Sequence, residues 1–291
     1  MTNTHENGLA TRLSGGRPLL GLYHGFPAEG ILETIGPGWD FVWIDGQHGQ
    51  FSIDTALRAV RTASALGLET VLRVPTHDAG LLAQYADTAA SAMMIPQVES
   101  AEVAAAVVRA LRFPPRGSRS FGGRRPIDAH GRDYYRTREP LVVVQIESQT
   151  ALESVEQIAA VEGVDLLFFG ADDMKLSLAL PVETLVGDND QLSQAQGHIA
   201  RAARAAGKGC GCGIVKPQDV SILAEMGYHL LAIGGDVPFL RTGARQALDE
   251  GRRALPQSVA SVDGQPRRAE SQPPHFVTQA RQKDTQRQAT R

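Results

Sequence analysis

Two apolar runs in the middle of the chain are each followed closely by acidic side chains. The run LVVVQI at 141–146 ends at Glu147, and the run VDLLFFG at 164–170 comes just before Asp172 and Asp173. In a repeating β/α protein, charges that follow buried parallel strands lie at the carboxyl edge of the sheet, where active sites are built. Two such acids could share a hard divalent cation, because water and substrate oxygens complete its coordination. An isolated acid at such a position is more often a helix N-terminal carboxylate that interacts with the helix dipole.

A histidine and an arginine follow two earlier apolar runs. Asp45 and His48 come after DFVWI at 40–44, and Arg73 lies inside VLRVP. Histidine titrates near neutral pH, as a general base requires, although a loop histidine bonded to backbone would have the same setting. A buried guanidinium needs a partner, either a barrel carboxylate or a substrate oxygen. A metal, a base and a fixed cation together are typical of carbon–carbon bond chemistry on a 2-oxo acid.

These residues follow strands in a regular alternation of apolar runs and amphipathic stretches. We predict eight strands, at 18–23, 40–44, 69–74, 91–95, 141–146, 164–169, 209–215 and 228–233. Helical spacing of apolar residues follows most of them. After the sixth run, 170–190 is expected to be a loop, and 116–140, rich in Gly and Arg, is long enough to be a functional loop.

Eight strand–helix units predict a (β/α)8 TIM barrel from 17 to 253. The rival architecture is an open doubly wound sheet, but the first β–α turn lacks the G-x-G-x-x-G of dinucleotide-binding folds. Residues 1–16 are expected to be flexible. The segment 254–291 is basic, rich in Gln, Arg, Ser and Pro, and is expected to be disordered.

Composition restricts the class of partner. The chain has 291 residues, 42% of them hydrophobic, with 29 basic and 32 acidic side chains and a net charge of −3. That balance argues against nucleic acid as a partner. No stretch approaches the ~20 apolar residues of a membrane span, and the N-terminus lacks the apolar core of a signal peptide. A cytoplasmic protein that acts on a small molecule is therefore expected.

With these residues in place, the chain resembles the HpcH/HpaI aldolase family of pyruvate-dependent class II aldolases. The resemblance covers about Gly21 to Leu240 and runs through WIDGQHG, VLRVP, VVVQIES, VEGVDLLFFGADD and GYHLLAIGGD. It implies a phosphoenolpyruvate/pyruvate-type barrel that uses Mg²⁺, Mn²⁺ or Co²⁺ and reversibly cleaves a 4-hydroxy-2-oxo acid to pyruvate and an aldehyde. It also implies a homo-oligomer, commonly a hexamer with an exchanged C-terminal helix.

The resemblance implies roles for individual residues. Glu147 and Asp173 would be the metal ligands, and His48 would be the base, with its ring held by Asp87. Arg73 would bind the pyruvate oxygen. The remaining residues expected at the substrate are Tyr23, Asp45, Gln145, Gly170 and Asp172, the last through its backbone.

The chain departs from the family pattern at three places that concern substrate choice. Gln47 stands where many members have Glu, Ala171 and Asp172 replace Pro-Ala, and Tyr23 occupies a position often held by Trp. Two other functions remain open. One is a citrate-lyase-like CoA-ester lyase, and the other is a non-catalytic barrel that binds 2-oxo acids and serves a partner through its basic tail.

Overall fold

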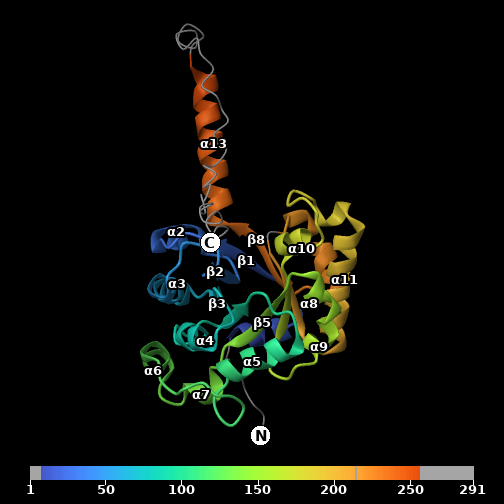
Figure 1. Ribbon diagram of the computed structural model, residues 1–291. Helices are drawn as coiled ribbons and strands as arrows, with labels where there is room; N and C mark the ends of the chain where they lie inside the picture. Colours follow the sequence, from blue (N-terminus) through green and yellow to red (C-terminus); the bar gives the residue numbers. More distant parts are fainter. Residues whose placement is uncertain (1–7, 214, 256–291) are drawn as a thin grey trace, which may run out of the picture. The chain divides into compact units, whose positions relative to one another are not determined.

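A computed structural model describes residues 8–213 and 215–255 of the chain. In this part, eight parallel strands close into a barrel in sequence order (Figure 1). Each strand overlaps the apolar run predicted for it, so the prediction of a (β/α)8 barrel is confirmed. The strands are β1 (Leu19–His24), β2 (Phe41–Asp45), β3 (Glu69–Arg73), β4 (Ala92–Ile95), β5 (Leu141–Ile146), β6 (Leu166–Phe169), β7 (Gly209–Cys212) and β8 (Leu230–Gly235).

Helices surround the barrel and bury one face against it (Figure 1). They are α2 (Glu29–Ile35), α3 (Ile53–Ala65), α4 (Ala79–Ala86), α5 (Ala101–Leu111), α8 (Gln149–Glu153), α9 (Val155–Ala159), α10 (Ala171–Ser177), α11 (Asp190–Ala205) and α12 (Val220–Met226). Side chains that accept hydrogen bonds from the first turn begin several of them, including Ser52 at α3, Asp78 at α4 and Ser100 at α5. The larger hydrophobic cluster lies between this layer and the strands.

A second hydrophobic cluster fills the barrel interior. Phe41 and Trp43 of β2, Val143 of β5 and Phe168 of β6 belong to it, whereas Val42 of β2 faces the helices. Successive side chains of a strand point to opposite faces, so odd-numbered positions of β2 and β5 point inward. The interior is a packed core, as in other barrels of this type.

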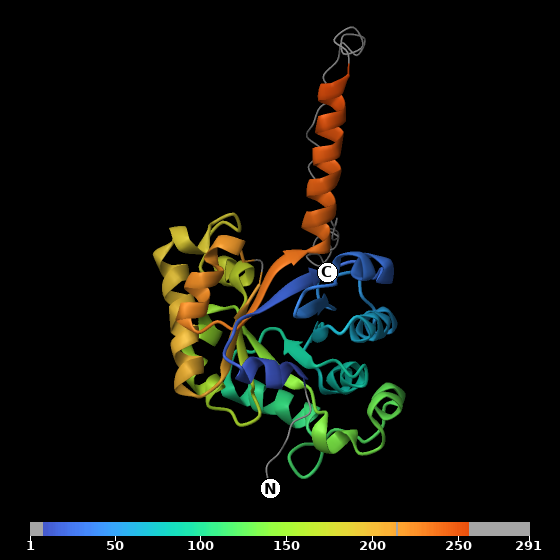
Figure 2. The ribbon, with the colours of Figure 1, turned by 180° about the vertical axis from the view of Figure 1, so that it is seen from behind.

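The N-terminal segment is partly ordered. The helix α1 (Gly8–Ser14) buries Leu9 completely, in the same cluster as the strand residues Leu19 and Phe41. Its Arg12 forms an ion pair with Asp40, just before β2. Figure 2 shows α1 next to the barrel, where these contacts place it at the amino ends of the strands. Within the segment 1–16, which was expected to be flexible, residues 8–14 form this helix, while residues 1–7 lie outside the described part.

The long segment between α5 and β5 is an arm at the amino ends of the strands. It contains two short helices, α6 (Arg124–His130) and α7 (Tyr134–Thr137). Because it leads into the start of β5, it lies at the end opposite the β–α loops. Packed rings of Phe113, Phe121 and Tyr134 stabilise it. Within one chain, the arm is remote from the acidic strand ends that the sequence singled out.

The chain divides into two compact units, residues 1–242 and 243–291. The first contains the barrel. The second continues the last helix, α13 (Asp236–Ala254), as far as the described residues reach. The predicted disordered tail lies outside them from residue 256 on. No helix in the described ranges is long and apolar enough to cross a membrane.

Candidate active site

The alternation of side chains explains why polar residues gather at one end of the barrel. Asp45 continues the inward-pointing series of Phe41 and Trp43, and Gln145 follows Val143 in the same way. Arg73 follows inward-facing Val71. These polar side chains come at the carboxyl ends of their strands, where the apolar filling stops. All three are nevertheless buried, with exposed fractions of 0%, 1% and 7% for Asp45, Gln145 and Arg73.

Asp45 and Arg73 form an ion pair with two hydrogen bonds. The two residues are register partners on β2 and β3. Arg73 Nε donates to Asp45 Oδ1 at 2.8 Å, and Nη2 donates to Oδ2 at 2.7 Å. Tyr23 Oη also donates to Oδ2, at 2.9 Å. Burial opposes ionisation of Asp45, but the hydrogen bonds and charge of Arg73 outweigh it and lower the pKa of the carboxyl group.

The nitrogen of Arg73 that Asp45 does not bind is Nη1. This nitrogen makes one long contact, 3.5 Å to Gln145 Oε1. Burial and the neighbouring Asp45 raise the pKa of Tyr23, so the phenol stays protonated and donates to the carboxylate. Arg73 is thus a fixed cation with one nitrogen, Nη1, that lacks a short hydrogen bond among the described residues.

Glu147 is held by one oxygen and leaves the other without a partner. Its Oε1 accepts a hydrogen bond of 2.7 Å from the backbone N–H of Gln97. Gln97 follows β4 in a left-handed conformation with φ of 56°, which is strained for a residue with a Cβ. Glu147 Oε2 is buried and has no hydrogen-bond partner within the described chain. Burial and the negative charge of Asp173 raise the pKa of Glu147.

Gly170 gives Glu147 its space. A Cβ at Gly170 would lie 2.6 Å from Cβ of Glu147 and 2.7 Å from its Oε2. Such distances are below van der Waals contact, so a side chain here would displace the carboxylate.

The two aspartates after β6 are in different environments. They lie in the first turn of α10, a helix that forms where a loop was expected. Asp172 Oδ1 accepts a hydrogen bond of 2.9 Å from the buried Lys175, whose Nζ also donates to the carbonyl of Val182. Asp173 instead lines the cavity that contains Glu147. The structure therefore separates Asp173, which faces Glu147, from Asp172, which is neutralised by a lysine.

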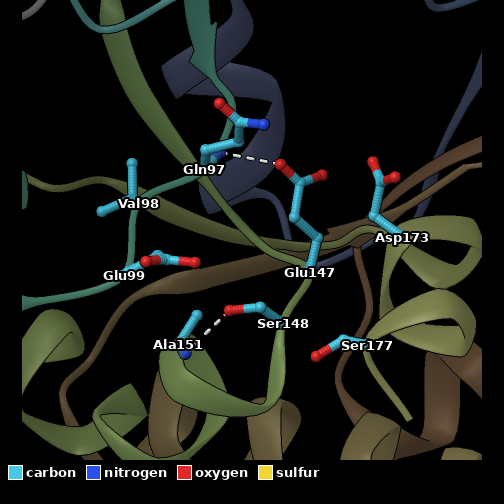
Figure 3. Close-up of a pocket in the computed structure, with 8 residues that line it drawn as sticks. All are labelled: Gln97, Val98, Glu99, Glu147, Ser148, Ala151, Asp173 and Ser177. Carbon is cyan, nitrogen blue, oxygen red and sulfur yellow. Dashed lines mark hydrogen bonds between the residues drawn. The ribbon is translucent and has the colours of Figure 1, made fainter. Parts of the chain in front are cut away.

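Figure 3 shows this cavity at the carboxyl end of the barrel. It has a volume of about 170 Å³. Glu147 and Asp173 project into it from neighbouring β–α units. Its walls are formed by Gln97, Val98, Glu99, Glu147, Ser148, Ala151, Asp173 and Ser177.

The donor set fits a hard divalent cation. Carboxylate oxygens and water are the ligands that Mg²⁺ prefers, and a Mg²⁺ site needs only one or two protein carboxylates. The unpartnered Oε2 of buried Glu147, with Asp173 beside it, provides that pair. Among the described residues, no group of three or more His, Cys, Asp or Glu is arranged to bind a metal ion.

His48 lies in the turn after β2, at the same end of the barrel. Its backbone N–H donates to Asp45 Oδ1 at 3.2 Å, so the Asp45–Arg73 pair also fixes the start of this turn. The residue is exposed to solvent. Its imidazole is therefore accessible to a substrate in the mouth.

Within one chain, Asp87 and His48 lie at opposite ends of the barrel, so the contact expected between them stays a prediction that a single copy does not test. Asp87 caps the carboxyl end of α4, and α4 runs back from β3 to the amino end of the barrel. Its Oδ1 accepts a 2.8 Å hydrogen bond from Arg119 of the arm. The motif match carried no information on which end of the barrel Asp87 occupies.

The sequence did not predict the contributions of Gln97 and Lys175 to the site. Gln97 acts through its backbone N–H, and no side-chain pattern reports a positive φ. Lys175 lies three residues after Asp172, the i,i+3 spacing of an ion pair on a helix. This spacing would have been informative if the segment had been recognised as helical.

Comparisons with known proteins identify the proteins that this chain is similar to. The family model described as HpcH/HpaI aldolase/citrate lyase matches residues 24–242. A hydroxypyruvate/pyruvate aldolase of Delftia acidovorans is 32% identical over 244 residues, which cover 82% of this chain and 90% of that protein. A 4-hydroxy-2-oxo-heptane-1,7-dioate aldolase of Shigella flexneri is 30% identical over 248 residues, which cover 82% of this chain and 91% of that protein.

Solved structures of similar proteins have the same fold as this chain. The crystal structure of an HpcH/HpaI aldolase/citrate lyase family protein from Burkholderia cenocepacia has a TM-score of 0.77 and 32% identity, and covers 84% of this chain and 99% of that chain. A citrate lyase beta subunit from M. tuberculosis, with a TM-score of 0.51, 17% identity and coverage of 75% and 91%, shares the fold.

Proposed function

Because the chain belongs to the HpcH/HpaI aldolase/citrate lyase family, we propose that it is an aldolase that depends on a divalent metal ion. The reaction is the reversible cleavage of a 4-hydroxy-2-oxo acid to pyruvate and an aldehyde. The observation that carries this proposal is the buried Glu147 with one unpartnered oxygen beside Asp173. A buried carboxylate oxygen without a hydrogen bond, next to a second carboxylate, supports the binding of a cation at this position.

Glu147 and Asp173 would hold a Mg²⁺, Mn²⁺ or Co²⁺ ion. When bound, such an ion supplies Lewis acidity toward the carbonyl oxygen of a 2-oxo acid. Asp45 holds Arg73 so that Nη1 remains available for an oxygen that gains negative charge during the reaction. Gln145, Gly170 and the backbone of Asp172 would line the pocket around the 2-oxo acid.

His48 would move the proton. In the cleavage direction, its imidazole removes the proton of the 4-hydroxyl group, the C3–C4 bond breaks, and the aldehyde leaves. The electron pair remains on the three-carbon fragment as the enolate of pyruvate, whose oxygen Arg73 would stabilise. The imidazolium of His48 then returns the proton to C3, which gives pyruvate. In the reverse direction the base removes a C3 proton of pyruvate, the enolate attacks the aldehyde, and the imidazolium protonates the alkoxide that forms.

The test is synthesis of an aldol adduct. Purified protein is incubated with pyruvate, a panel of hydroxyaldehydes and Mn²⁺, and a parallel sample is treated with EDTA and then resupplied with Mn²⁺. We expect an adduct that disappears with EDTA and returns with the metal. A wild-type protein that forms no metal-dependent adduct with any aldehyde would contradict the proposal, and the Glu147→Gln variant is the control for adventitious catalysis.

A CoA-ester lyase is the second candidate, because the matching family model is described as covering citrate lyase as well as aldolase. The two candidates differ in the second substrate. If the chain acts on CoA esters, CoA should compete with pyruvate for the metal-loaded protein. If it is an aldolase, CoA should leave pyruvate binding unchanged.

We also propose a homo-oligomer, with a hexamer as the expected state. Asp87 lies at the amino end of the barrel and His48 at the carboxyl end. A contact between them therefore requires a second copy of the chain. Light scattering of the purified protein gives the oligomeric state, and a monomer that is fully active would contradict this part of the proposal.

A further inference from the structure

Arg73 lies over the ring face of Trp43. Its Cζ is 4.9 Å from the ring centroid of Trp43. Trp43 is two residues before Asp45 on β2, so it points to the same interior face of the barrel. It is 5% exposed. The guanidinium is therefore fixed by Asp45 at its edge and covered by an indole on one face.

Two further aromatic rings hold Trp43 in place. Tyr23 and Phe168 each contact it edge-to-face, with centroids 5.3 Å away in both cases. Gly213, just after β7, leaves room for the indole, because a Cβ there would lie 2.4 Å from Cζ3 of Trp43. The indole thus has contacts on several sides, and its plane is set by β1, β2, β6 and the residue that follows β7.

The hydrogen-bonding group of Trp43 does not explain its presence. Nε1 is buried and has no hydrogen-bond partner in the described part of the chain. A buried donor without a partner costs stability, and a leucine or phenylalanine would fill the interior without that cost. What only the indole offers at this position is the largest π face for a cation.

We propose that Trp43 is a positioning residue for Arg73 in the proposed reaction. Asp45 occupies Nε and Nη2 of Arg73, but an edge contact alone leaves the guanidinium free to tilt about that edge. The indole face fixes the tilt. Nη1 is then held toward the mouth of the barrel, where the carbonyl or enolate oxygen of the 2-oxo acid would bind.

The contribution of the contact between Trp43 and Arg73 to substrate affinity depends on the burial of both side chains. A cation–π contact is stronger when the cation is desolvated, and Arg73 is 7% exposed. We expect loss of the indole face to weaken the affinity for the 2-oxo acid about 5- to 30-fold. Metal affinity should not change, because Trp43 does not line the cavity that contains Glu147 and Asp173.

The test weakens the negative potential of the indole face and leaves the shape of the ring nearly unchanged. The chain has two tryptophans, so a Trp39→Phe background leaves Trp43 as the only one. Full-length protein is then produced with tryptophan analogues that carry increasing numbers of fluorine atoms, which weaken the negative potential of the ring face. Pyruvate affinity of the Mn²⁺-loaded protein is measured by calorimetry, and Mn²⁺ affinity by electron paramagnetic resonance.

We expect the dissociation constant of pyruvate to rise steadily with fluorination, and that of Mn²⁺ to stay constant. Trp43→Phe should retain part of the pyruvate affinity and Trp43→Leu should lose more, with thermal unfolding to verify that both fold. In an Arg73→Lys background, the fluorinated series should have a smaller effect. A purely structural role would give equal losses in both backgrounds.

This inference rests on the proposed function, and the two can fail separately. If wild-type protein binds Mn²⁺ and pyruvate but affinity does not change across the fluorinated series, the role of Trp43 is wrong and the aldolase proposal stands. If wild-type protein does not bind pyruvate with Mn²⁺, both are wrong.

Discussion

Asp45 and Arg73 are register partners on adjacent strands, and their side chains form a two-contact ion pair at the mouth of the barrel. The sequence left two interpretations open for Arg73, a bridge to a barrel carboxylate or a grip on substrate. The structure shows the bridge, and the bridge restricts the second interpretation. Among the described residues, Nη1 of Arg73 is the nitrogen without a short hydrogen bond. A substrate oxygen would therefore meet one nitrogen and not the two-pronged fork of a free guanidinium.

Replacing Asp45 with asparagine should therefore impair catalysis without removing the metal. The amide turns an N–H₂ group toward one guanidinium nitrogen, and a charged hydrogen bond in a buried site is lost. Such bonds contribute about 1.5–3 kcal/mol, so we expect kcat/KM for pyruvate addition to fall about 10- to 100-fold. Mn²⁺ affinity should be unchanged. Tyr23→Phe is the matched control, because it removes one neutral donor from the same carboxylate, and it should cost less.

The strands of the barrel were predictable from the sequence. Each of the eight was identified because an interior strand of a barrel is apolar on both faces and stands out against amphipathic neighbours. The short helices α1 and α10 were missed for a related reason. Each has seven residues, too few for a helical period to be recognised, and tertiary contacts such as the burial of Leu9 stabilise α1.

The sequence predicted only those site residues that lie at or beside the ends of strands. Asp45, Arg73, Gln145 and Glu147 lie at or beside the carboxyl ends of strands, so their common location followed from the barrel. The contact of Glu147 with the backbone of Gln97 did not, because it depends on a left-handed residue after β4. For Asp87, the motif match supplied a role, and the direction of α4 places the residue at the other end of the barrel within one chain. Its predicted contact with His48 therefore depends on a second copy of the chain.

The metal-free Glu147→Gln variant should be more stable than wild type at neutral pH. Burial and the negative charge of Asp173 raise the folded-state pKa of Glu147 above its ordinary value. A carboxyl group of this kind contributes stability that is fully present below the unfolded pKa and is lost as pH rises through the folded pKa. The variant removes that loss. Thermal unfolding of EDTA-treated proteins should show the gain at pH 7 and no gain below about pH 4.

Metal should reverse this order. We expect Mn²⁺ to bind the folded wild type and to raise its unfolding temperature, whereas Glu147→Gln should show little response. Equal stabilisation of both proteins by Mn²⁺ would place the metal elsewhere.

Adding one methyl group at Gly170 should weaken metal binding. The new Cβ would lie 2.7 Å from Glu147 Oε2, so the carboxylate must rotate away from the position that faces Asp173. We expect Gly170→Ala to reduce Mn²⁺ affinity at least about 10-fold, comparable with the loss of a group that orients a ligand. Gly187→Ala is the control, because a Cβ there meets nothing within 4 Å. Titration by electron paramagnetic resonance compares them, and similar affinities would separate Glu147 from the metal.

The two neighbouring aspartates should behave differently when neutralised. Asp173→Asn removes a proposed ligand and should abolish Mn²⁺ binding at micromolar concentrations. Asp172→Asn removes an exposed partner of Lys175. It leaves a lysine whose charge is no longer neutralised near the cavity, so Mn²⁺ affinity should fall only a few-fold. The reverse ranking would assign the ligand to Asp172 and would require α10 to rotate.

Replacing His48 with alanine should stop proton transfer and leave the metal in place. The proposed base removes a C3 proton of pyruvate, so wild-type protein with Mn²⁺ in D₂O should exchange these protons, which proton NMR follows directly. General-base catalysis contributes about 10²- to 10⁴-fold, and we expect a loss in that range with Mn²⁺ and pyruvate affinities near wild type. His77 is the matched control, since it lies in the loop after β3 at the same end of the barrel and is also exposed. Exchange that persists in His48→Ala and is lost in His77→Ala would move the base from the turn after β2 to the loop after β3. Exchange that persists in both variants would indicate a base that is not a histidine of these two loops.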